Sequence, residues 1–83
     1  MDAKLNVTWD GQNGDLPDMV DYDSTTAELL QLAEEAVTTG GIPGIDADPG
    51  ADFDDFIVDR FPANEAEGLP ARLMVRPKTP FGG

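Results

Sequence analysis

The sequence predicts an α+β domain in which one main helix packs across a mixed sheet of four to five strands. Three observations predict this class. Apolar residues alternate with polar residues in segments near both ends of the chain, which is the period of a strand with one buried face. One segment between them has apolar residues at spacings of three and four, which is the period of a helix. With 83 residues, the chain has room for one small domain.

The first expected strand covers residues 4–9. Its apolar residues fall at every second position and therefore share one face of the strand: Leu5, Val7 and Trp9. Trp9 lies at the end of this face, where an aromatic ring caps a core more often than it binds a ligand. We therefore expect Trp9 to pack against the core.

A hairpin is expected to follow this strand. Residues 10–14 contain two glycine dipeptides that are typical of turns, and residues 16–22 form a second extended run. Pro17 has no backbone N–H to donate, so the beginning of this strand is expected at an edge or a bulge. Val20 and Tyr22 are then the expected inward-facing pair.

The helix signal is the clearest one in the chain. Thr25 and Glu28 have the spacing of a capping box, in which the Thr25 hydroxyl accepts from the N–H of Glu28 and the Glu28 carboxylate accepts from the N–H of Thr25. The helix is expected over residues 26–37 and is expected to end at the pair Gly40-Gly41. Its buried stripe is expected to contain Leu29, Leu32, Ala33, Ala36 and Val37.

Residues 42–55 are expected to form a mobile loop with little regular structure, because prolines and glycines recur along an acid-rich segment. Carboxylates at alternating positions between Asp46 and Asp55 raise the alternative of a calcium site. The segment departs from the EF-hand pattern, since Pro49 stiffens the turn and Ile57 stands where a bidentate glutamate is needed. We therefore expect a solvated acidic loop and no metal site.

Two more strands complete the expected sheet. β-branched and aromatic residues over residues 55–61 indicate a third strand, and residues 71–76 have the alternation of a last one. Residues 64–68 form a polar connection between them. In the last strand, Leu73 and Val75 are expected to face the core. The opposite face then presents Arg72, Met74 and Arg76.

The composition disfavours several classes of function. The chain has no Cys and no His, so it lacks the usual zinc ligands, the thiol nucleophile and the commonest general base at neutral pH. Catalysis is therefore not expected. Only five Lys and Arg against 17 Asp and Glu also disfavour binding to nucleic acid or to an anionic membrane. The beginning of the chain lacks the basic stretch and apolar run of a secretory signal, so a cytoplasmic location is expected.

The formal net charge of −12 is unevenly distributed. Residues 1–71 contain all 17 acidic residues together with Lys4 and Arg60, whereas the remainder contains no acid and three basic residues: Arg72, Arg76 and Lys78. We expect a folded domain over residues 1–76. Residues 77–83 are expected to form an extended, exposed tail, because their two prolines favour an extended backbone and few apolar side chains are available to pack.

This layout resembles that of a ubiquitin-like protein of the β-grasp fold. The resemblance rests on the opening hairpin, on the helix introduced by Ser24-Thr25-Thr26-Ala27-Glu28-Leu29 and on Gly41-Ile42-Pro43 soon after it. It also rests on the last strand, Arg72-Leu73-Met74-Val75-Arg76, which leads to Gly82-Gly83. The resemblance covers the whole chain as a layout, and its motif-like part is the terminal Gly-Gly with its basic, extended approach.

The resemblance implies a protein modifier rather than an enzyme. An E1-like adenylating enzyme then uses ATP and Mg²⁺ to activate the carboxylate of Gly83, an E2-like conjugating enzyme carries it as a cysteine thioester, and a target protein receives it on an amine. Gly82 has no side chain to hinder passage of the tail through a narrow channel. A deconjugating protease is a further expected partner. The free protein is expected to be a monomer that binds no cofactor itself, and the unusual tail favours a bacterial member.

The tail and the sheet supply the other expected site residues. Four residues are expected to take part in recognition of the tail: Arg72, Arg76, Lys78 and Phe81. Phe81 departs from the family, because eukaryotic ubiquitin-like tails usually carry an arginine there. The chain has two lysines, so modification by a single copy is favoured over lysine-linked chains. The aliphatic patch that the family exposes on its sheet has a smaller candidate counterpart in Met74, Ile57 and Met19.

Two alternatives stay open. Sulfur carriers of cofactor biosynthesis resemble this chain in size, fold and Gly-Gly end, and in them the terminal carboxylate becomes a thiocarboxylate. Phe81 favours this alternative because those proteins tend to have apolar residues before the glycines, whereas the basic residues of the last strand and tail favour the modifier. The second alternative is a non-covalent acidic interaction module, which the net charge of −12 favours.

Overall fold

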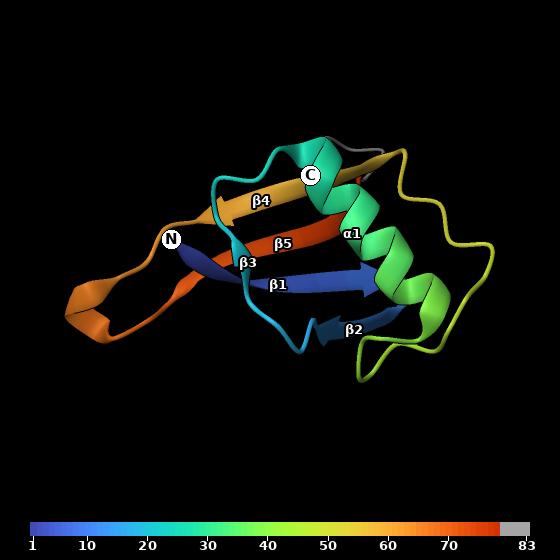
Figure 1. Ribbon diagram of the computed structural model, residues 1–83, viewed down its shortest axis with the longest axis horizontal. Coiled ribbons are helices and arrows are strands. Elements are labelled where there is room, and N and C mark those ends of the chain that lie inside the picture. Colours follow the sequence, from blue (N-terminus) through green and yellow to red (C-terminus); the bar gives the residue numbers. More distant parts are fainter. Residues whose placement is uncertain (79–83) are drawn as a thin grey trace.

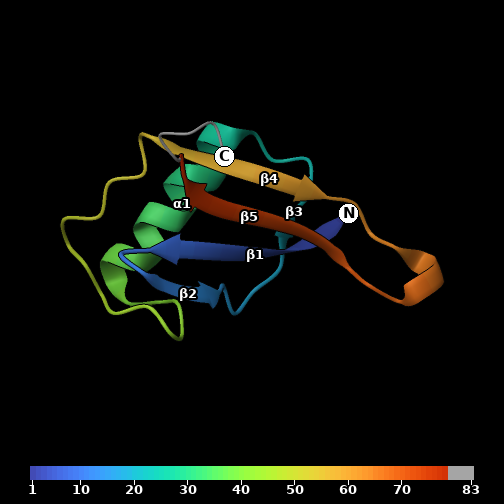
Figure 2. The same ribbon diagram turned by 180° about the vertical axis from the view of Figure 1, so that it is seen from behind.

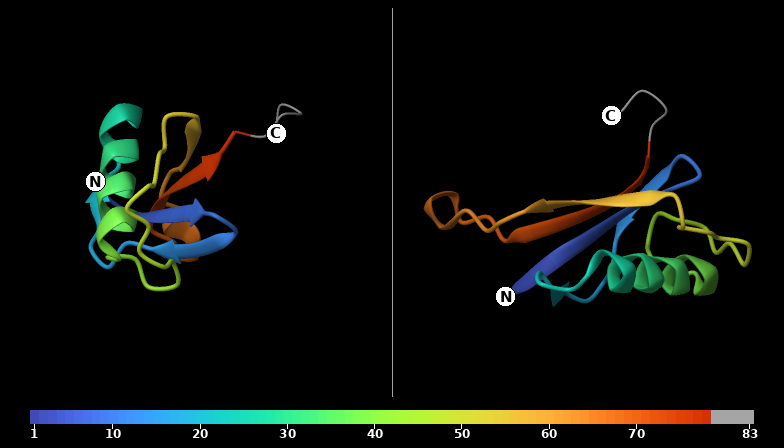
Figure 3. Two further views of the ribbon diagram at one scale, coloured as in Figure 1. Left: turned by 90° about the vertical axis from the view of Figure 1, so that its right-hand side faces the viewer. Right: turned by 90° about the horizontal axis from the view of Figure 1, so that it is seen from above.

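The computed structural model describes residues 1–78. One helix lies across one face of a sheet, as Figure 1 shows from the helix side and Figure 3 shows edge-on. In chain order, the elements are β1 (Asp2–Trp9), β2 (Gln12–Asp15), β3 (Val20–Asp21), α1 (Thr26–Thr39), β4 (Phe56–Phe61), the short 3₁₀ helix η1 (Glu65–Glu67) and β5 (Ala71–Pro77).

The sheet is mixed and has five strands. Its path is β2-β1-β5-β4, and β3 pairs with β1 outside this path. β1 and β5 run parallel, whereas β1 pairs in antiparallel fashion with β2 and β3, as β5 does with β4. The predicted α+β class, with one main helix across a mixed sheet, is therefore confirmed.

The first hairpin is tighter than the sequence predicts. Asp10 and Gly11 both have positive φ, 50° and 76°, which is typical of a type I′ turn. Such a turn reverses the chain within two residues and matches the twist of the strands, so β2 begins at Gln12. The prediction of a longer turn followed by a strand over residues 16–22 is wrong. Of that run, only Val20–Asp21 forms a strand, which pairs with the first residues of β1.

α1 begins where the sequence predicts and runs to Thr39, two residues further than the predicted range of 26–37. The Thr25 hydroxyl accepts from the N–H of Glu28 at 3.1 Å, and Glu28 Oε1 accepts from the N–H of Thr25 at 2.9 Å. Gly40 closes the helix with a φ of 74°, a left-handed conformation that glycine adopts without strain. The predicted stripe is confirmed: Leu29, Ala33 and Val37 are buried, and Leu32 and Ala36 are half-buried beside them.

The segment between α1 and β4 contributes to the core. Residues 41–55 contain no helix or strand, as the sequence predicts, and they return along one side of the molecule to the beginning of β4 (Figure 1). Four side chains of this segment are nevertheless buried: Ile42, Ile45, Ala51 and Phe53. They anchor the loop to the core, whereas the sequence predicts a mobile, solvated segment. Its apolar residues follow no regular period, so the sequence contains no pattern from which their burial could be predicted.

The core lies between α1 and one face of the sheet. The two central strands supply most of its floor. The predicted inward residues Leu5, Val7, Leu73 and Val75 are buried there, together with Ala3 and Ala71. Half-buried side chains at its margin include the expected Trp9, Val20 and Tyr22. Within residues 1–78, no helix is long and apolar enough to cross a membrane.

Candidate functional site

The face of the sheet opposite α1 is not covered by any described element, and we call it the open face (Figure 2). Paired residues on neighbouring strands point to the same side of a sheet, so the register defines its composition. β5 forms the central row with the three predicted outward residues: Arg72, Met74 and Arg76. The neighbouring rows contain Lys4 and Asn6 on β1, and Ile57, Asp59 and Phe61 on β4.

Two arginines of the central row have different surroundings. Arg76 Nε donates to Asp59 Oδ2 in a partly buried ion pair. The Arg72 guanidinium lies 5.8 Å from the centre of the Phe61 ring, and one of its nitrogens lies 3.6 Å from Met74 Sδ. Neither contact neutralises Arg72, and within residues 1–78 it forms no ion pair. Arg76 is therefore neutralised by a carboxylate, whereas Arg72 has no counter-ion among residues 1–78.

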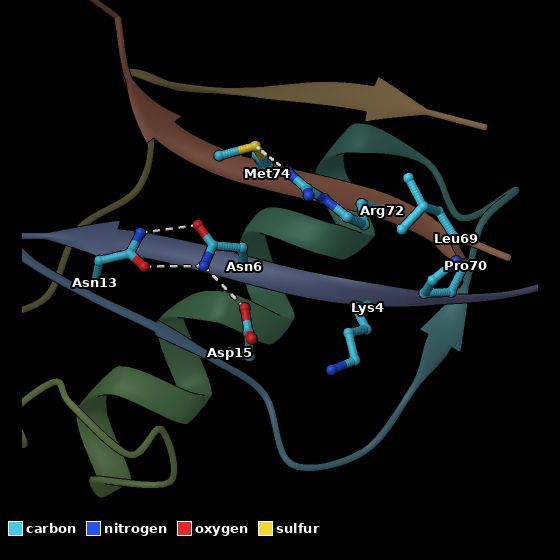
Figure 4. A pocket seen from close by; sticks show the side chains of 8 residues that line it. All are labelled: Lys4, Asn6, Asn13, Asp15, Leu69, Pro70, Arg72 and Met74. Carbon is cyan, nitrogen blue, oxygen red and sulfur yellow. Dashed lines mark hydrogen bonds between the residues drawn. The ribbon is translucent and has the colours of Figure 1, made fainter. Parts of the chain in front are cut away.

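A hollow of ≈ 430 Å³ lies beside Arg72 on the open face (Figure 4). It brings together two predicted site residues, Arg72 and Met74, with residues from β1, β2 and the segment before β5. Its lining consists of Lys4, Asn6, Asn13, Asp15, Leu69, Pro70, Arg72 and Met74. Two cations and the apolar surface of a leucine, a proline and a methionine therefore meet in one place.

One wall of the hollow is a network of amide side chains, drawn with dashed lines in Figure 4. Asn6 Nδ2 donates to Asp15 Oδ1 at 2.8 Å and to Asn13 Oδ1 at 3.0 Å. Asn13 Nδ2 donates back to Asn6 Oδ1 at 2.8 Å and also to Thr8 Oγ1 at 2.9 Å. These polar groups already have partners, so the network holds a wall in place and leaves Lys4 and Arg72 as the groups available to a ligand.

The opposite wall belongs to a projecting segment. Residues 62–70, which we call the finger, extend beyond the end of the sheet, and all of them are exposed (Figure 3). η1 turns the chain at the tip, and a single bridge between Asn64 and Leu69 links the two sides of the finger. Two large apolar side chains flank its base, Phe61 with 46% and Leu69 with 51% of their surface exposed.

The predicted aliphatic patch is assembled only in part. Met74 and Ile57 are diagonal neighbours on the open face, because Ile57 pairs with Arg76, two residues beyond Met74. Met19 directly precedes β3, and two strands, β1 and β5, separate β3 from β4. At about 4.8 Å between neighbouring strands, β3 and β4 are roughly 14 Å apart. The sheet therefore brings Met74 and Ile57 together and keeps Met19 away from Ile57.

The tail departs from the end of β5. This strand runs to Pro77, one residue further than predicted, and the N–H of Lys78 still donates to a backbone carbonyl before β4 at 3.3 Å. Of the predicted conjugation and recognition residues in the tail, Lys78 is described, whereas Phe81, Gly82 and Gly83 lie outside the described residues 1–78.

The acid-rich loop uses its carboxylates within the domain. Asp48 Oδ2 accepts from Trp9 Nε1 at 2.9 Å, and Asp48 Oδ1 accepts from the N–H of Gly50 at 2.9 Å. Asp46 Oδ2 accepts from Gln12 Nε2 at 3.0 Å. In the part of the chain that the structure describes, no three His, Cys, Asp or Glu side chains are grouped so as to hold a metal ion. The calcium alternative therefore gains no support here.

Six lining residues were not expected as site residues: Lys4, Asn6, Asn13, Asp15, Leu69 and Pro70. Lys4 and Asn6 alternate with buried residues of β1, so the sequence does indicate that they face away from the core. What the sequence does not indicate is that β1 pairs in parallel with β5 and so places Lys4 beside Arg72. Leu69 and Pro70 reach the hollow only because of the path of the finger, for which the sequence contains no periodic signal.

Comparisons with known proteins add no assignment. No family model, no curated protein and no solved structure matches this chain. A function must therefore be argued from the fold, the open face and the sequence of the tail.

Proposed function

We propose that this protein is a ubiquitin-like modifier with a β-grasp fold, whose Gly83 is joined to amines of target proteins. The observation that carries the proposal is the place of the last strand. β5 lies in the middle of the sheet, parallel to β1 and antiparallel to β4, with α1 across one face. A mixed sheet of this kind is compatible with the β-grasp, and the sequence continues from β5 to Gly82-Gly83.

The chemistry would be supplied by partners. A carboxylate oxygen of Gly83 attacks the α-phosphorus of ATP held with Mg²⁺ by an E1-like enzyme, and pyrophosphate leaves. A cysteine thiolate then displaces AMP to form a thioester, which passes to an E2-like enzyme until an amine of the target displaces the thiol. After the first attack by the Gly83 carboxylate, the thiol and amine nucleophiles belong to other proteins, which agrees with a chain that has no Cys and no His.

The surroundings of β5 support a role in presenting a tail. The strand is hydrogen-bonded to a neighbour on each side, and its inward residues Ala71, Leu73 and Val75 are buried. An enzyme that binds the residues after such a strand does not need to break a ladder or expose the core. The domain can therefore stay folded while an enzyme binds and activates its C-terminus.

The positions of the basic residues reduce the number of them that we expect to guide the tail. Arg76 is paired with Asp59. Arg72 lies roughly 20 Å before Lys78 along the extended strand, too far to approach the same channel entrance. We therefore assign guidance of the tail to Lys78. Because activation uses ATP, we place this function in the cytoplasm.

The proposal is tested by proteomics in the native host. Trypsin cleaves after Lys78, so a modified target lysine would carry the branched remnant Thr79-Pro80-Phe81-Gly82-Gly83. We expect this remnant on lysines of several proteins. The control is a chain that lacks Gly82 and Gly83, which should unfold at the same urea concentration and give no conjugates.

Other outcomes distinguish the alternatives. Conjugates that persist with the shortened chain would contradict the proposal. Absence of the remnant, together with an intact mass in which sulfur replaces one oxygen, would instead support a sulfur carrier, which Phe81 before the glycines favours. An unmodified mass throughout would leave the acidic interaction module, in line with the net charge of −12.

A further inference from the structure

We propose that the hollow on the open face binds an acidic segment of a partner protein, with a carboxylate at Lys4 and Arg72 and an aliphatic side chain against Leu69, Pro70 and Met74. The hollow contains no residue of the tail, so this inference does not depend on the proposed modifier function. It holds equally for a modifier, a carrier or an interaction module.

The parallel pairing of β1 and β5 creates the cationic part of the hollow. Lys4 and Arg72 are register partners, so their backbones lie about 4.8 Å apart and their side chains leave the same face of the sheet. Both side chains are exposed, and neither forms an ion pair within residues 1–78. Figure 4 shows the two side chains extending in different directions, Arg72 along β5 toward Met74 and Lys4 away from Arg72, so both add positive potential to the hollow and both attract a carboxylate there.

The charge of the rest of the molecule makes this pair unusual. The chain has a net charge of −12, and of its five basic residues Arg60 and Arg76 already donate to oxygen atoms of the domain. Asp15 is the one acid that lines the hollow, and it accepts from Asn6 on the far wall. An acidic segment is therefore repelled by most of the surface and attracted at this point, which favours a single binding position.

The apolar part of the hollow lies next to the cations. Leu69 is 51% exposed at the base of the finger, Pro70 follows it, and Met74 lies half-buried on the floor. Methionine adapts its shape to what packs on it, and proline loses little conformational freedom when it is covered. An aliphatic side chain two or three positions from the carboxylate would cover these residues while the carboxylate stays at the rim (Figure 4).

The test uses three blocked hexapeptides and isotope-labelled protein. The first peptide has two acidic residues on each side of Leu-Ile, the second has Ser-Ser in place of Leu-Ile, and the third has lysines in place of the acids. With the first peptide, amide shifts are expected at Lys4, Asn6, Leu69, Arg72 and Met74. The second is expected to bind at least about tenfold more weakly, because it loses the apolar contact. The third is expected to shift amides of the acidic surface and not those of the hollow.

Variants with matched charge complete the test. Arg72→Gln and Gln31→Glu change the net charge by the same amount, but Gln31 lies exposed on α1, across the sheet from the hollow. We expect Arg72→Gln to weaken binding of the first peptide about tenfold and Gln31→Glu to change it less than about twofold. Lys4→Gln, at a second exposed position, should act in the same direction as Arg72→Gln and serves if that variant does not fold.

Three results would overturn the inference. The first is an absence of shifts in the hollow at millimolar concentrations of the first peptide. The second is equal weakening by Arg72→Gln and Gln31→Glu, which would mean that net charge alone controls binding. The third is equal affinity for the Leu-Ile and Ser-Ser peptides, which would remove the apolar contact from the site.

Discussion

At the scale of single residues, Gly14 of β2 is the point at which the loop that follows α1 packs closely against the sheet. A Cβ atom at this position would lie 2.2 Å from the carbonyl oxygen of Pro43 and 2.8 Å from Cγ2 of Ile42. These distances are shorter than van der Waals contact, and the nearest atom belongs to backbone. Gly14 is therefore required for close approach of the loop to the sheet.

We predict that Gly14→Ala destabilises the domain by about 1–3 kcal/mol, as overpacking at a close contact does. Gly50→Ala is the matched control, because a Cβ there would have Asp48 Oδ1 at 3.5 Å as its nearest neighbour. The control is expected to change stability by less than about 1 kcal/mol. Urea unfolding of both variants measures the difference. Similar midpoints for the two would show that the loop moves away from β2 at little cost.

At the scale of elements, the N-terminus of α1 is held by a carboxylate. The N–H of Thr25 donates to Glu28 Oε1 and lowers the pKa of Glu28, and the hydrogen bond between Glu28 and the Thr25 hydroxyl lowers it further. Desolvation and the charge of Asp21 raise it by less. Because these hydrogen bonds favour the charged form of Glu28, the stability that the capping box adds to the helix depends on pH.

The sign of this link defines a prediction. The folded-state pKa of Glu28 lies below its unfolded value, so its stabilising contribution is fully present above the unfolded value and is lost as pH falls through the folded one. We expect the stability difference between wild type and Glu28→Gln to shift against wild type as pH is lowered through this range. Glu35→Gln, on the same helix but outside the capping box, measures the effect of net charge alone. Parallel pH profiles for the two variants would contradict the prediction.

Predictability from the sequence differed between elements. α1 was predictable because the capping box, the apolar stripe and the final glycine all act over short distances along the chain. β1 and β5 were predictable from alternation, and β4 was predictable from its β-branched and aromatic residues. β2 was missed because two positive φ values at Asp10-Gly11 moved the turn ahead of the second glycine dipeptide. In the hollow, Arg72 and Met74 were predicted as outward residues, but their neighbours depend on strand pairing.

At the scale of the whole molecule, the charge of −12 is confined to a small volume. The radius of gyration is 12.5 Å, which is less than the Debye length of about 30 Å at ~10 mM salt and more than that of about 8 Å at ~150 mM. At low salt, like charges therefore repel one another across the whole folded domain. At higher salt, repulsion is limited to near neighbours.

We predict that the domain is more stable in urea at ~150 mM than at ~10 mM NaCl, since screening relieves more repulsion in the compact state than in the unfolded chain. A double variant, Glu34→Gln with Glu35→Gln, removes two negative charges and should show a smaller gain with salt. Unfolding midpoints at the two salt concentrations measure both. A loss of stability with added salt would mean that attractive pairs such as Arg76–Asp59 outweigh the excess of acids.

The sequence by itself determined the α+β class, the helix with both of its ends, the inward and outward faces of β1 and β5, and the excess of acid. These features depend on residues within a few positions of one another. Only the tertiary structure decided that β1 pairs in parallel with β5, that Lys4 therefore meets Arg72, that the acid-rich loop enters the core and that Leu69 and Pro70 reach the hollow. Such pairings join residues far apart in the chain, and they are selected by packing of the whole core rather than by any local pattern.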